Sequence, residues 1–211
     1  QMDIHSLRKE YKFKVLNRKS VDKNPFKQFE TWLNEAIKSE IMDPTAMTVS
    51  TIDENSFPQS RIVLLKYLDE NGFVFFTNYK SQKGKSIENN PSVSLLFFWP
   101  ELERQVRIDG FANKTSKTLS EKYFHSRPLE SRIGAWASEQ SSKIPNRKYL
   151  EKRFGSFKKK FGFAPPLPDF WGGFNVSPVK IEFWQGRENR LHDRILYEKT
   201  ENEWKIKRLA P

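Results

Sequence analysis

Three side chains that carry or can carry a positive charge are spaced two residues apart in the segment NRLHDRIL: Arg190, His192 and Arg194. If this segment is a strand, side-chain alternation places all three on one face. Like charges on one face repel each other, and a bound anion or electron-rich ring would relieve that repulsion. Neighbouring guanidinium groups also disfavour the protonated imidazole, which leaves His192 able to accept a proton. The alternative is an exposed edge strand without a ligand.

The segment SRIVLLKYL predicts a strand over residues 60–68. Alternation separates Arg61 and Leu65 from Ile62 and Lys66, so cations stand at both ends of an apolar stretch. A flat ligand could lie along this strand. Alternatively, the terminal lysine simply extends to solvent.

The segment NYKSQKGKS follows another predicted strand, and Ser81 is expected to cap a helix there. The first turns of that helix carry Lys83 and Lys85. Cations at a helix N-terminus are electrostatically unfavourable unless an anion lies among them. The segment therefore indicates either an anion site or a short surface helix with unpaired lysines.

Tyr123, Arg127 and Ser131 recur every four residues, although Pro128 is expected to break or restart their helix. A phenol, a guanidinium and a hydroxyl that converge form a good phosphate clamp. Gln140 and Ser141 follow in a predicted loop.

The composition limits the possible classes of function. The chain has 211 residues, a formal net charge of +11 and no cysteine. The positive excess predicts nucleic acid or phosphorylated small molecules as partners. The segment KRFGSFKKKFG favours nucleic acid, but no nucleic-acid-binding signature accompanies it, and a solvated helix face is the alternative. The three histidines lack the spacing of a zinc site, which makes a zinc enzyme an unfavoured class. No apolar run approaches the roughly 20 residues of a membrane span. We expect a cytoplasmic setting.

The hydrophobic pattern predicts an α+β protein, an antiparallel β-barrel with peripheral helices. Residues 1–23 are basic and aperiodic and are expected to form a mobile arm. A helix capped by Asn24 should carry an apolar stripe from Phe26 to Ile41 through Phe29, Leu33 and Ile37. Predicted strands cover 46–52, 60–68, 72–78, 92–99, 104–112, 179–186, 189–198 and 203–211, and further helices begin near Ser81, cover 116–128 and follow Asn146; a proline-rich loop covers 164–174.

The motifs, taken in order, resemble the pyridoxamine 5'-phosphate oxidase family, FMN enzymes of vitamin B6 metabolism. They are RKEY, DPTAM, RIVLLK, IENNPSVSLLF, ERQVRIDG, YFHSRP, the IGAWAS and QSS region, FWGGF, IEFWQG, RLHDR and RLAP, and they run through nearly the whole chain.

The resemblance implies an FMN-binding split β-barrel, antiparallel and Greek-key-like, with 24–211 as a single domain. It implies a homodimer with FMN at the subunit interface, each site using residues of both chains. The implied reaction is oxidation of pyridoxamine or pyridoxine 5'-phosphate to pyridoxal 5'-phosphate. A hydride equivalent passes from substrate C4' to flavin N5, O2 is the electron acceptor, and H2O2 is released, with ammonia from the amine.

The resemblance also implies site residues. FMN would be bound by Arg61, Ile62, Val63, Leu64, Leu65, Lys66, Phe76, Thr77, Gln82, Lys83, Gln105, Gln140, Ser141, Trp184 and Arg194. The substrate would be bound by Arg8, Tyr11, Lys66, Tyr123, Arg127, Ser131, Arg190, Leu191 and His192. Of these, Arg190 is expected to position and polarise the substrate, with His192 as a polar or proton-accepting contact. No metal is expected.

One departure from the family pattern concerns FMN. The family usually has Ser-Arg-Lys where this chain has Ser81-Gln82-Lys83, so one cationic contact to the FMN phosphate is replaced by an amide. FMN should bind more weakly unless Lys80 or Lys85 compensates.

Two other functions stay open at this point. A related split-barrel flavin oxidase with another substrate would be expected to lack the full set of Lys66, Tyr123, Arg127 and Ser131. A non-catalytic basic protein that binds nucleic acid would be colourless; with the family resemblance, no nucleic acid or membrane partner is expected.

Overall fold

The structure is a computed structural model that describes residues 10–11, 14–201 and 203–211. Its helices are α1 (Pro25–Lys38), α2 (Gln82–Asn89), α3 (Lys117–Ser126), α4 (Leu129–Ala137) and α5 (Arg147–Phe161), with short 3-10 turns η1 (Pro100–Leu102) and η2 (Glu188–Arg190). Its strands are β1 (Ala46–Ile52), β2 (Pro58–Leu64), β3 (Tyr67–Asp69), β4 (Gly72–Asn78), β5 (Ser92–Trp99), β6 (Arg104–Lys114), β7 (Trp171–Gln185), β8 (Asp193–Lys199) and β9 (Trp204–Leu209).

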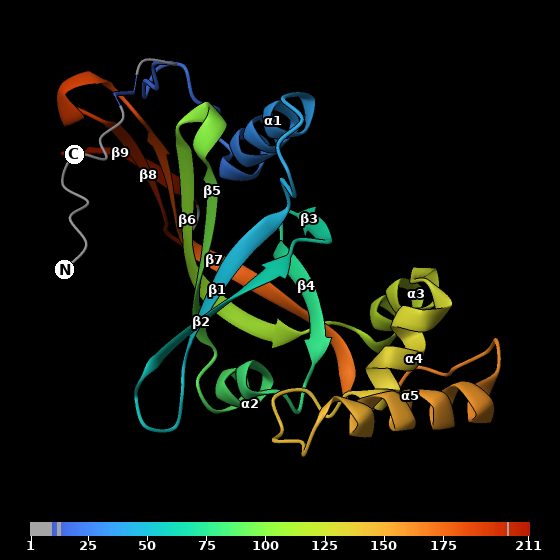
Figure 1. The fold of residues 1–211 in the computed structure, drawn as a ribbon. Coiled ribbons are helices and arrows are strands. Elements are labelled where there is room, and N and C mark those ends of the chain that lie inside the picture. Colours follow the sequence, from blue (N-terminus) through green and yellow to red (C-terminus); the bar gives the residue numbers. More distant parts are fainter. Residues whose placement is uncertain (1–9, 12–13, 202) are drawn as a thin grey trace, which may run out of the picture. The chain divides into compact units, whose positions relative to one another are not determined.

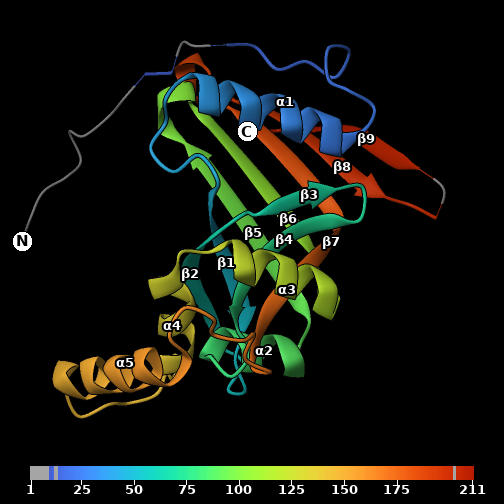
Figure 2. The same ribbon diagram turned by 90° about the vertical axis from the view of Figure 1, so that its right-hand side faces the viewer.

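The strands of the described residues form one sheet, which Figures 1 and 2 show from two sides. Its order is β2-β1-β5-β6-β7-β4-β3, and β8 pairs with both β7 and β9. The pairs β3–β4, β4–β7, β7–β8 and β8–β9 are antiparallel. The predicted α+β class with antiparallel strands is therefore confirmed.

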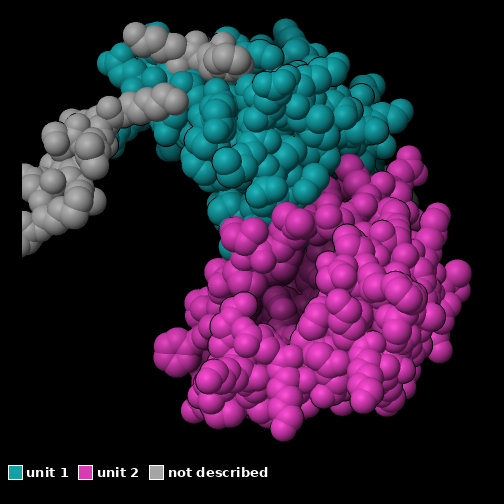
Figure 3. Space-filling model, turned by 45° about the vertical axis from the view of Figure 1, so that its right-hand side comes forward, with its two compact units in different colours: residues 1–48, 94–109, 178–211 teal, residues 49–93, 110–177 magenta. Residues whose placement is uncertain are grey.

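The chain divides into two compact units, coloured separately in Figure 3. Unit 1 consists of residues 1–48, 94–109 and 178–211, and unit 2 of residues 49–93 and 110–177. The expectations of a mobile arm over 1–23 and a single domain over 24–211 stay predictions. Part of that arm, residues 1–9 and 12–13, lies outside the described residues.

The core of unit 1 is built around α1. The Asn24 side chain accepts a hydrogen bond from the Phe26 backbone N–H, as its predicted capping role requires. The ring centres of Phe29 and Phe97 are 4.8 Å apart, and those of Trp32 and Phe183 are 5.2 Å apart. The predicted apolar stripe is wrong beyond the first two turns, because Ile37 is 50% exposed while Trp32 and Ala36 are buried.

Three helices of unit 2 begin where the sequence predicts, and α4 follows the break expected at Pro128. Ser81, Ser116 and Asn146 cap α2, α3 and α5 with side-chain hydrogen bonds, and Pro128 separates α3 from α4. Figures 1 and 2 both show α4 and α5 side by side, and Trp136 of α4 lies 4.9 Å from Phe161 of α5. None of the described helices has the length and apolar character needed to cross a bilayer.

Two predicted boundaries are corrected. The expected strand over 60–68 is interrupted, since β2 ends at Leu64 and β3 starts at Tyr67. The proline-rich loop ends earlier than expected, because β7 already begins at Trp171 and pairs with β4 from there. The predicted strands over 46–52, 72–78 and 92–99 match β1, β4 and β5.

Candidate active site

Unit 2 contains a cavity of about 810 Å³, and Figure 3 shows this unit hollowed on the face in view. Its lining includes many of the predicted site residues: Arg61, Ile62, Val63, Leu64, Lys66, Phe76, Thr77, Gln82, Lys83, Tyr123, Arg127, Ser131, Gln140 and Ser141. Four of these are cations, and the described residues that line the cavity include no aspartate or glutamate. The cavity therefore carries positive charge that no carboxylate of its lining neutralises.

Lys83 is the most buried of these cations, with 8% of its surface exposed. Its Nζ lies 3.1 Å from Thr77 Oγ1, 3.3 Å from Gln140 Oε1 and 3.4 Å from Ser81 Oγ. Burial, followed by the charge of Arg61, lowers the pKa of Lys83 to about 8. All three of these partners are neutral, so the site favours an anion that would restore the full charge of Lys83.

Arg61 is held against the wall of the cavity by neutral oxygens. Its Nη1 donates to Thr51 Oγ1 and to the Gln59 carbonyl, both at 2.8 Å. Burial lowers the pKa of this guanidinium. The next residues of β2 alternate, with Ile62 exposed and Val63 half-buried. The strand thus presents a fixed cation followed by an apolar edge.

The N-terminus of α2 is fixed close to the preceding turn. A Cβ atom at position 84 would lie 2.1 Å from the Tyr79 carbonyl oxygen, so this approach requires Gly84. The Gln82 backbone N–H donates to Ser141 Oγ at 3.1 Å. These contacts join the helix start to the 140–141 loop that was predicted to line the same site.

The two lysines that could compensate for Gln82, Lys80 and Lys85, lie outside the described lining of the cavity. The Lys80 Nζ instead lies 5.6 Å from the centre of the Phe170 ring. The weaker FMN binding expected from Gln82 therefore stays a prediction.

Tyr123, Arg127 and Ser131 line the cavity together although Pro128 interrupts their helix. Arg127 is the C-cap of α3, and Ser131 lies in the first turn of α4. The Arg127 Nη1 atom is buried and has no hydrogen-bond partner among the described residues. Burial lowers the pKa of Arg127. A buried guanidinium nitrogen without a partner fits a site that receives an anionic oxygen.

The hairpin between β7 and β8 in unit 1 corrects the strand predicted over 189–198. Strand β8 begins only at Asp193, and Arg190 belongs to the turn η2. Asn189 and Arg190 both have positive φ, at 56° and 60°. Because Arg190 and His192 precede the strand, alternation does not align them with Arg194.

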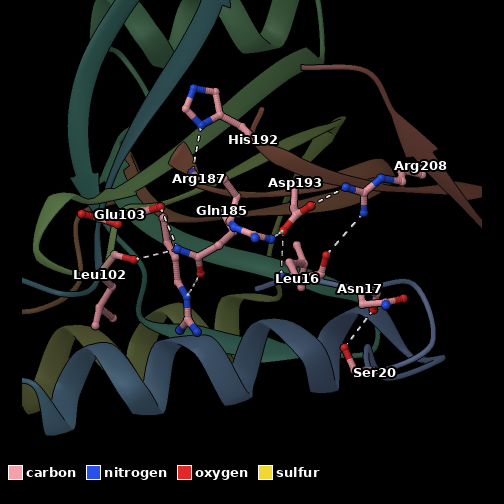
Figure 4. A network of polar contacts seen from close by, with 11 residues as sticks. Leu16, Asn17, Ser20, Leu102, Glu103, Gln185, Arg187, His192, Asp193 and Arg208 are labelled. Carbon is pink, nitrogen blue, oxygen red and sulfur yellow. Dashed lines mark hydrogen bonds and ion pairs between the residues drawn. The ribbon is translucent and has the colours of Figure 1, made fainter. Parts of the chain in front are cut away.

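The expected crowding of like charges is also relieved within the chain. Arg194 donates to both carboxylate oxygens of Glu182, at 3.0 and 2.9 Å, and to the Ala210 carbonyl. Asp193 pairs with Arg187 at 2.8 Å and with Arg208, as Figure 4 shows. An anionic ligand is therefore not needed to explain these arginines.

His192 is held by a hydrogen bond and two aromatic rings. Its Nδ1 accepts from the Arg187 backbone N–H at 3.1 Å (Figure 4). The ring centres of Trp184 and Tyr11 lie 4.7 and 5.8 Å away. Burial, and then the charge of Arg190, lower the pKa of His192, although Asp193 opposes this. A neutral imidazole whose Nδ1 accepts a hydrogen bond carries its proton on Nε2.

The remaining predicted site residues fall outside the described lining of the cavity. Leu65 is buried, and four others belong to unit 1: half-buried Gln105, Trp184 and Tyr11, and exposed Leu191. Arg8 lies outside the described residues.

The sequence reasoning missed several lining residues, among them Trp171, Asn78 and Ser138. Trp171 pairs with Asn78 across β4 and β7. A signal for Trp171 was available, because it belongs to the FWGGF motif that entered the family resemblance. The proline-rich loop predicted over 164–174 includes this motif, whereas Trp171 begins β7 beside the cavity.

Comparison with known proteins decides the family. Residues 33–160 match the family model described as pyridoxamine 5'-phosphate oxidase, and residues 171–211 match the pyridoxine 5'-phosphate oxidase C-terminal dimerisation region. The chain is 53% identical to the pyridoxine/pyridoxamine 5'-phosphate oxidase of Haemophilus influenzae over 100% of both chains. The chain belongs to the pyridoxamine 5'-phosphate oxidase family.

Solved structures of related proteins agree with this family. PhzG from Burkholderia lata, determined with tetrahydrophenazine-1-carboxylic acid, superposes with a TM-score of 0.89 at 27% identity, covering 94% of this chain and 99% of its own. An FMN-binding, pyridoxamine 5'-phosphate oxidase-related protein of Nostoc punctiforme shares the fold at a TM-score of 0.71 and 17% identity, covering 89% and 98%. The expected split-barrel fold of the family is confirmed.

Proposed function

We propose that this chain is an FMN-dependent oxidase that converts pyridoxamine 5'-phosphate and pyridoxine 5'-phosphate to pyridoxal 5'-phosphate, with O2 as the electron acceptor. The observation that carries the proposal is the cavity of unit 2. Arg61, Lys66, Lys83 and Arg127 line it, and its described lining contains no carboxylate. Its two phosphorylated ligands would supply the missing negative charge. The full-length identity to an oxidase of that name supports the choice of substrate.

The residues around Lys83 fit the phosphate of FMN. Lys83 and Arg61 would bind its oxygens, and the Ser141 hydroxyl, which accepts from the Gln82 backbone N–H, offers a further donor. The apolar edge of β2 at Ile62 gives a surface for a flat ring system. When bound, FMN supplies the two-electron acceptor that protein side chains lack. The protein's part is to hold the ring and bring the substrate to it.

The second set of cavity residues fits the phosphate of the substrate. Lys66, Tyr123, Arg127 and Ser131 offer an ammonium, a phenol, a guanidinium and a hydroxyl to one ligand. The unpartnered Nη1 of Arg127 provides a donor that is already desolvated. Binding at the phosphate would orient the rest of the substrate for reaction.

We assign Arg190 and His192 to the reacting side of the substrate. Arg190 is exposed and has no ion pair among the described residues, so its charge is available to a ligand. Neutral His192 offers an Nε2–H donor, since its Nδ1 already accepts from Arg187. The polar contact expected from the sequence is thus favoured over proton acceptance, which would require this bond to break.

A homodimer is part of the proposal. It is supported by the match of residues 171–211 to a dimerisation region. In the family, FMN lies at the subunit interface and each site uses both chains, and on this basis Trp184, Arg190, His192 and Arg194 are assigned to the site. A cytoplasmic location also remains part of the proposal, supported by the cysteine-free sequence.

A related oxidase with another substrate is the second candidate, because PhzG has the same fold. The 27% identity to PhzG against 53% to the Haemophilus influenzae enzyme favours the first candidate. The presence of Lys66, Tyr123, Arg127 and Ser131 around one cavity favours it as well.

The test is oxygen consumption by the FMN-loaded protein. We expect uptake of O2 with pyridoxamine 5'-phosphate and with pyridoxine 5'-phosphate, and formation of pyridoxal 5'-phosphate in equal amount. Unphosphorylated pyridoxine serves as the matched control and should react poorly, because it lacks the group that the clamp binds. Absence of oxygen uptake with both phosphorylated substrates would reject the proposal.

A further inference from the structure

The proposed substrate clamp consists of Lys66, Tyr123, Arg127 and Ser131. Trp171 contacts two of these residues, Tyr123 and Arg127, without being one of them. It begins β7, is 8% exposed and lines the cavity of unit 2. The Arg127 guanidinium lies over its indole at 4.7 Å from the ring centre. Its ring is also nearly parallel to that of Tyr123, at 10° and 6.1 Å. One side chain therefore packs against a guanidinium and a phenol that come from different helix positions.

Phe76 completes this packing. Its ring stacks on Tyr123 at 4.0 Å and 23°, and on Trp171 at 5.6 Å and 14°. The three rings are thus nearly parallel, and Phe124 meets Trp171 edge-on at 5.2 Å. Such contacts restrict the rotamers of Tyr123 and fix where its hydroxyl can lie.

The packing matters more for Arg127, because hydrogen bonds do not orient its outer nitrogen. Its Nη1 atom is buried and has no partner among the described residues. The indole face offers the attraction of a cation to an electron-rich ring, which is strongest for tryptophan. Trp171 thus holds the guanidinium in place while leaving a donor free.

The backbone gives Trp171 little freedom to move. Its N–H donates to the Pro168 carbonyl at 3.0 Å, and it pairs with Asn78 of β4. At the next position, Gly172, a Cβ atom would lie 2.2 Å from the Tyr79 hydroxyl. The backbone of β7 is therefore closely packed at this point, which fixes the position from which the indole of Trp171 projects.

We infer that Trp171 is a positioning residue that sets the enzyme's affinity for the phosphate group of its substrate by holding Arg127 and Tyr123. The inference rests on the proposed function and deepens it. Trp171 does not itself contact phosphate in this role, so its effect passes through the clamp.

The test replaces the indole and follows substrate binding separately from turnover. In FMN-loaded Trp171→Leu we expect KM for pyridoxamine 5'-phosphate to rise about tenfold, with kcat and FMN content nearly unchanged. Trp171→Phe keeps a smaller ring and should raise KM about threefold. Trp136→Leu is the matched control, since that indole packs on Phe157 and Phe161 of α5 and is not among the described cavity-lining residues.

A double-mutant cycle separates positioning from general structural damage. Because part of the effect passes through Arg127 and part through Tyr123, adding Trp171→Leu to Arg127→Ala should raise KM by clearly less than tenfold. An undiminished tenfold rise on that background, or unchanged KM in both single variants, would overturn the inference. So would a loss that falls on kcat or FMN content instead.

Phosphate binding itself gives a readout that does not depend on the reaction. Inorganic phosphate, titrated into FMN-loaded protein and followed by phosphorus NMR, should bind more weakly to Trp171→Phe and Trp171→Leu than to the wild type. If the wild type consumes no oxygen yet shows this ordering, the proposed function fails while the role of Trp171 stands. Equal phosphate affinity in all three proteins would reject that role.

Discussion

In unit 1, the arginines around the β7–β8 hairpin are paired with buried carboxylates. Arg194 binds Glu182 through two nitrogens, and Arg187 and Arg208 share Asp193. In unit 2, the cavity cations Lys83 and Arg61 contact only neutral oxygens in the hydrogen bonds of the described residues. The first arrangement holds the fold together, whereas the second leaves charge for a ligand to neutralise.

Residues needed for folding and residues available for binding can therefore be distinguished in this basic protein. A buried ion pair that loses one partner leaves an uncompensated charge, so the hairpin carboxylates should be critical for folding. Buried cations without carboxylates destabilise the ligand-free chain, so removing one should help folding while harming binding. Among the arginines of the β7–β8 hairpin, Arg190 differs from Arg187 and Arg194, because it is exposed and has no ion pair with the described residues.

The largest effect is expected from Asp193→Ala. Burial opposes ionisation of this carboxyl, but hydrogen bonds from Leu16, Arg187 and Arg208 outweigh it and lower its pKa. Removing it should lower the free energy of unfolding by about 3–5 kcal/mol, measured by urea denaturation. Glu198→Ala, which removes a less buried carboxylate paired with Lys207, is the control and should lose much less. Equal losses of unfolding free energy in the two variants would contradict the view that the buried pairs stabilise the fold more than the surface pairs do.

Arg190→Ala should affect the reaction and not the stability, in contrast to substitutions of the paired arginines of the same hairpin. We expect kcat/KM with pyridoxamine 5'-phosphate to fall about 100-fold, since a charge near the reacting groups is lost. FMN content and the urea midpoint should stay unchanged, because no ion pair is broken. Arg194→Ala should instead lower the midpoint, as Glu182 would be left buried without its bidentate partner. Wild-type kinetics in Arg190→Ala would remove Arg190 from the reaction.

Lys83→Met should change stability and FMN affinity in opposite directions. The folded-state pKa of Lys83, about 8, lies below its ordinary value, so the folded protein disfavours the charged form. Its unfavourable contribution is therefore full at neutral pH and disappears as pH rises from 8 toward 10.5. FMN-free Lys83→Met should be more stable than the wild type at pH 7 by roughly 1–3 kcal/mol, with the gap closing at pH 10.

The same variant should bind FMN at least tenfold more weakly, because a charge-assisted contact to phosphate is removed. Flavin fluorescence on dilution measures this affinity, and Lys85→Met, from outside the described cavity lining, is the control. A Lys83→Met protein that is less stable and retains FMN would contradict the assignment of Lys83 to a ligand.

The smallest effect concerns the titration of His192. Its folded pKa is lowered, mainly by burial, so its stabilising contribution is present above the ordinary value near 6.5 and is lost as pH falls through the folded pKa. NMR titration of its ring should give a midpoint below 6.5. In Arg190→Ala the midpoint should rise only part of the way, since burial remains. A wild-type midpoint above 6.5 would contradict the neutral Nε2–H form.

Local features of the fold could be read from the sequence because their causes lie within a few residues. Asn24, Ser81, Ser116 and Asn146 each satisfy backbone N–H groups two or three positions onward, so the side chain and its neighbours suffice to mark a helix start. Pro128 ends α3 for an equally local reason. Runs of β-branched and aromatic residues between turn signals identified β1 and β4.

The candidate site was only partly readable in this way. The motif resemblance selected Lys83, Tyr123 and Arg127, and the fold places them around one cavity. It also suggested Leu65, which is buried outside the described lining, and its role stays a prediction. The strand predicted over 60–68 is a separate case, since it continues past the break after Leu64. That break depends on the pairing of β3 with β4, which the local sequence does not display.

The pairing of charges depends on contacts between residues that are far apart in the sequence. Arg104 meets Glu35 across 69 positions, and the Leu16 N–H meets Asp193 across 177. A periodic pattern records which face a residue takes but not which distant residue lies opposite. The sequence therefore shows which residues carry positive charge in the β7–β8 hairpin and in the cavity. The fold pairs Arg187, Arg194 and Arg208 with Asp193 and Glu182, and it brings no carboxylate to the described lining of the cavity.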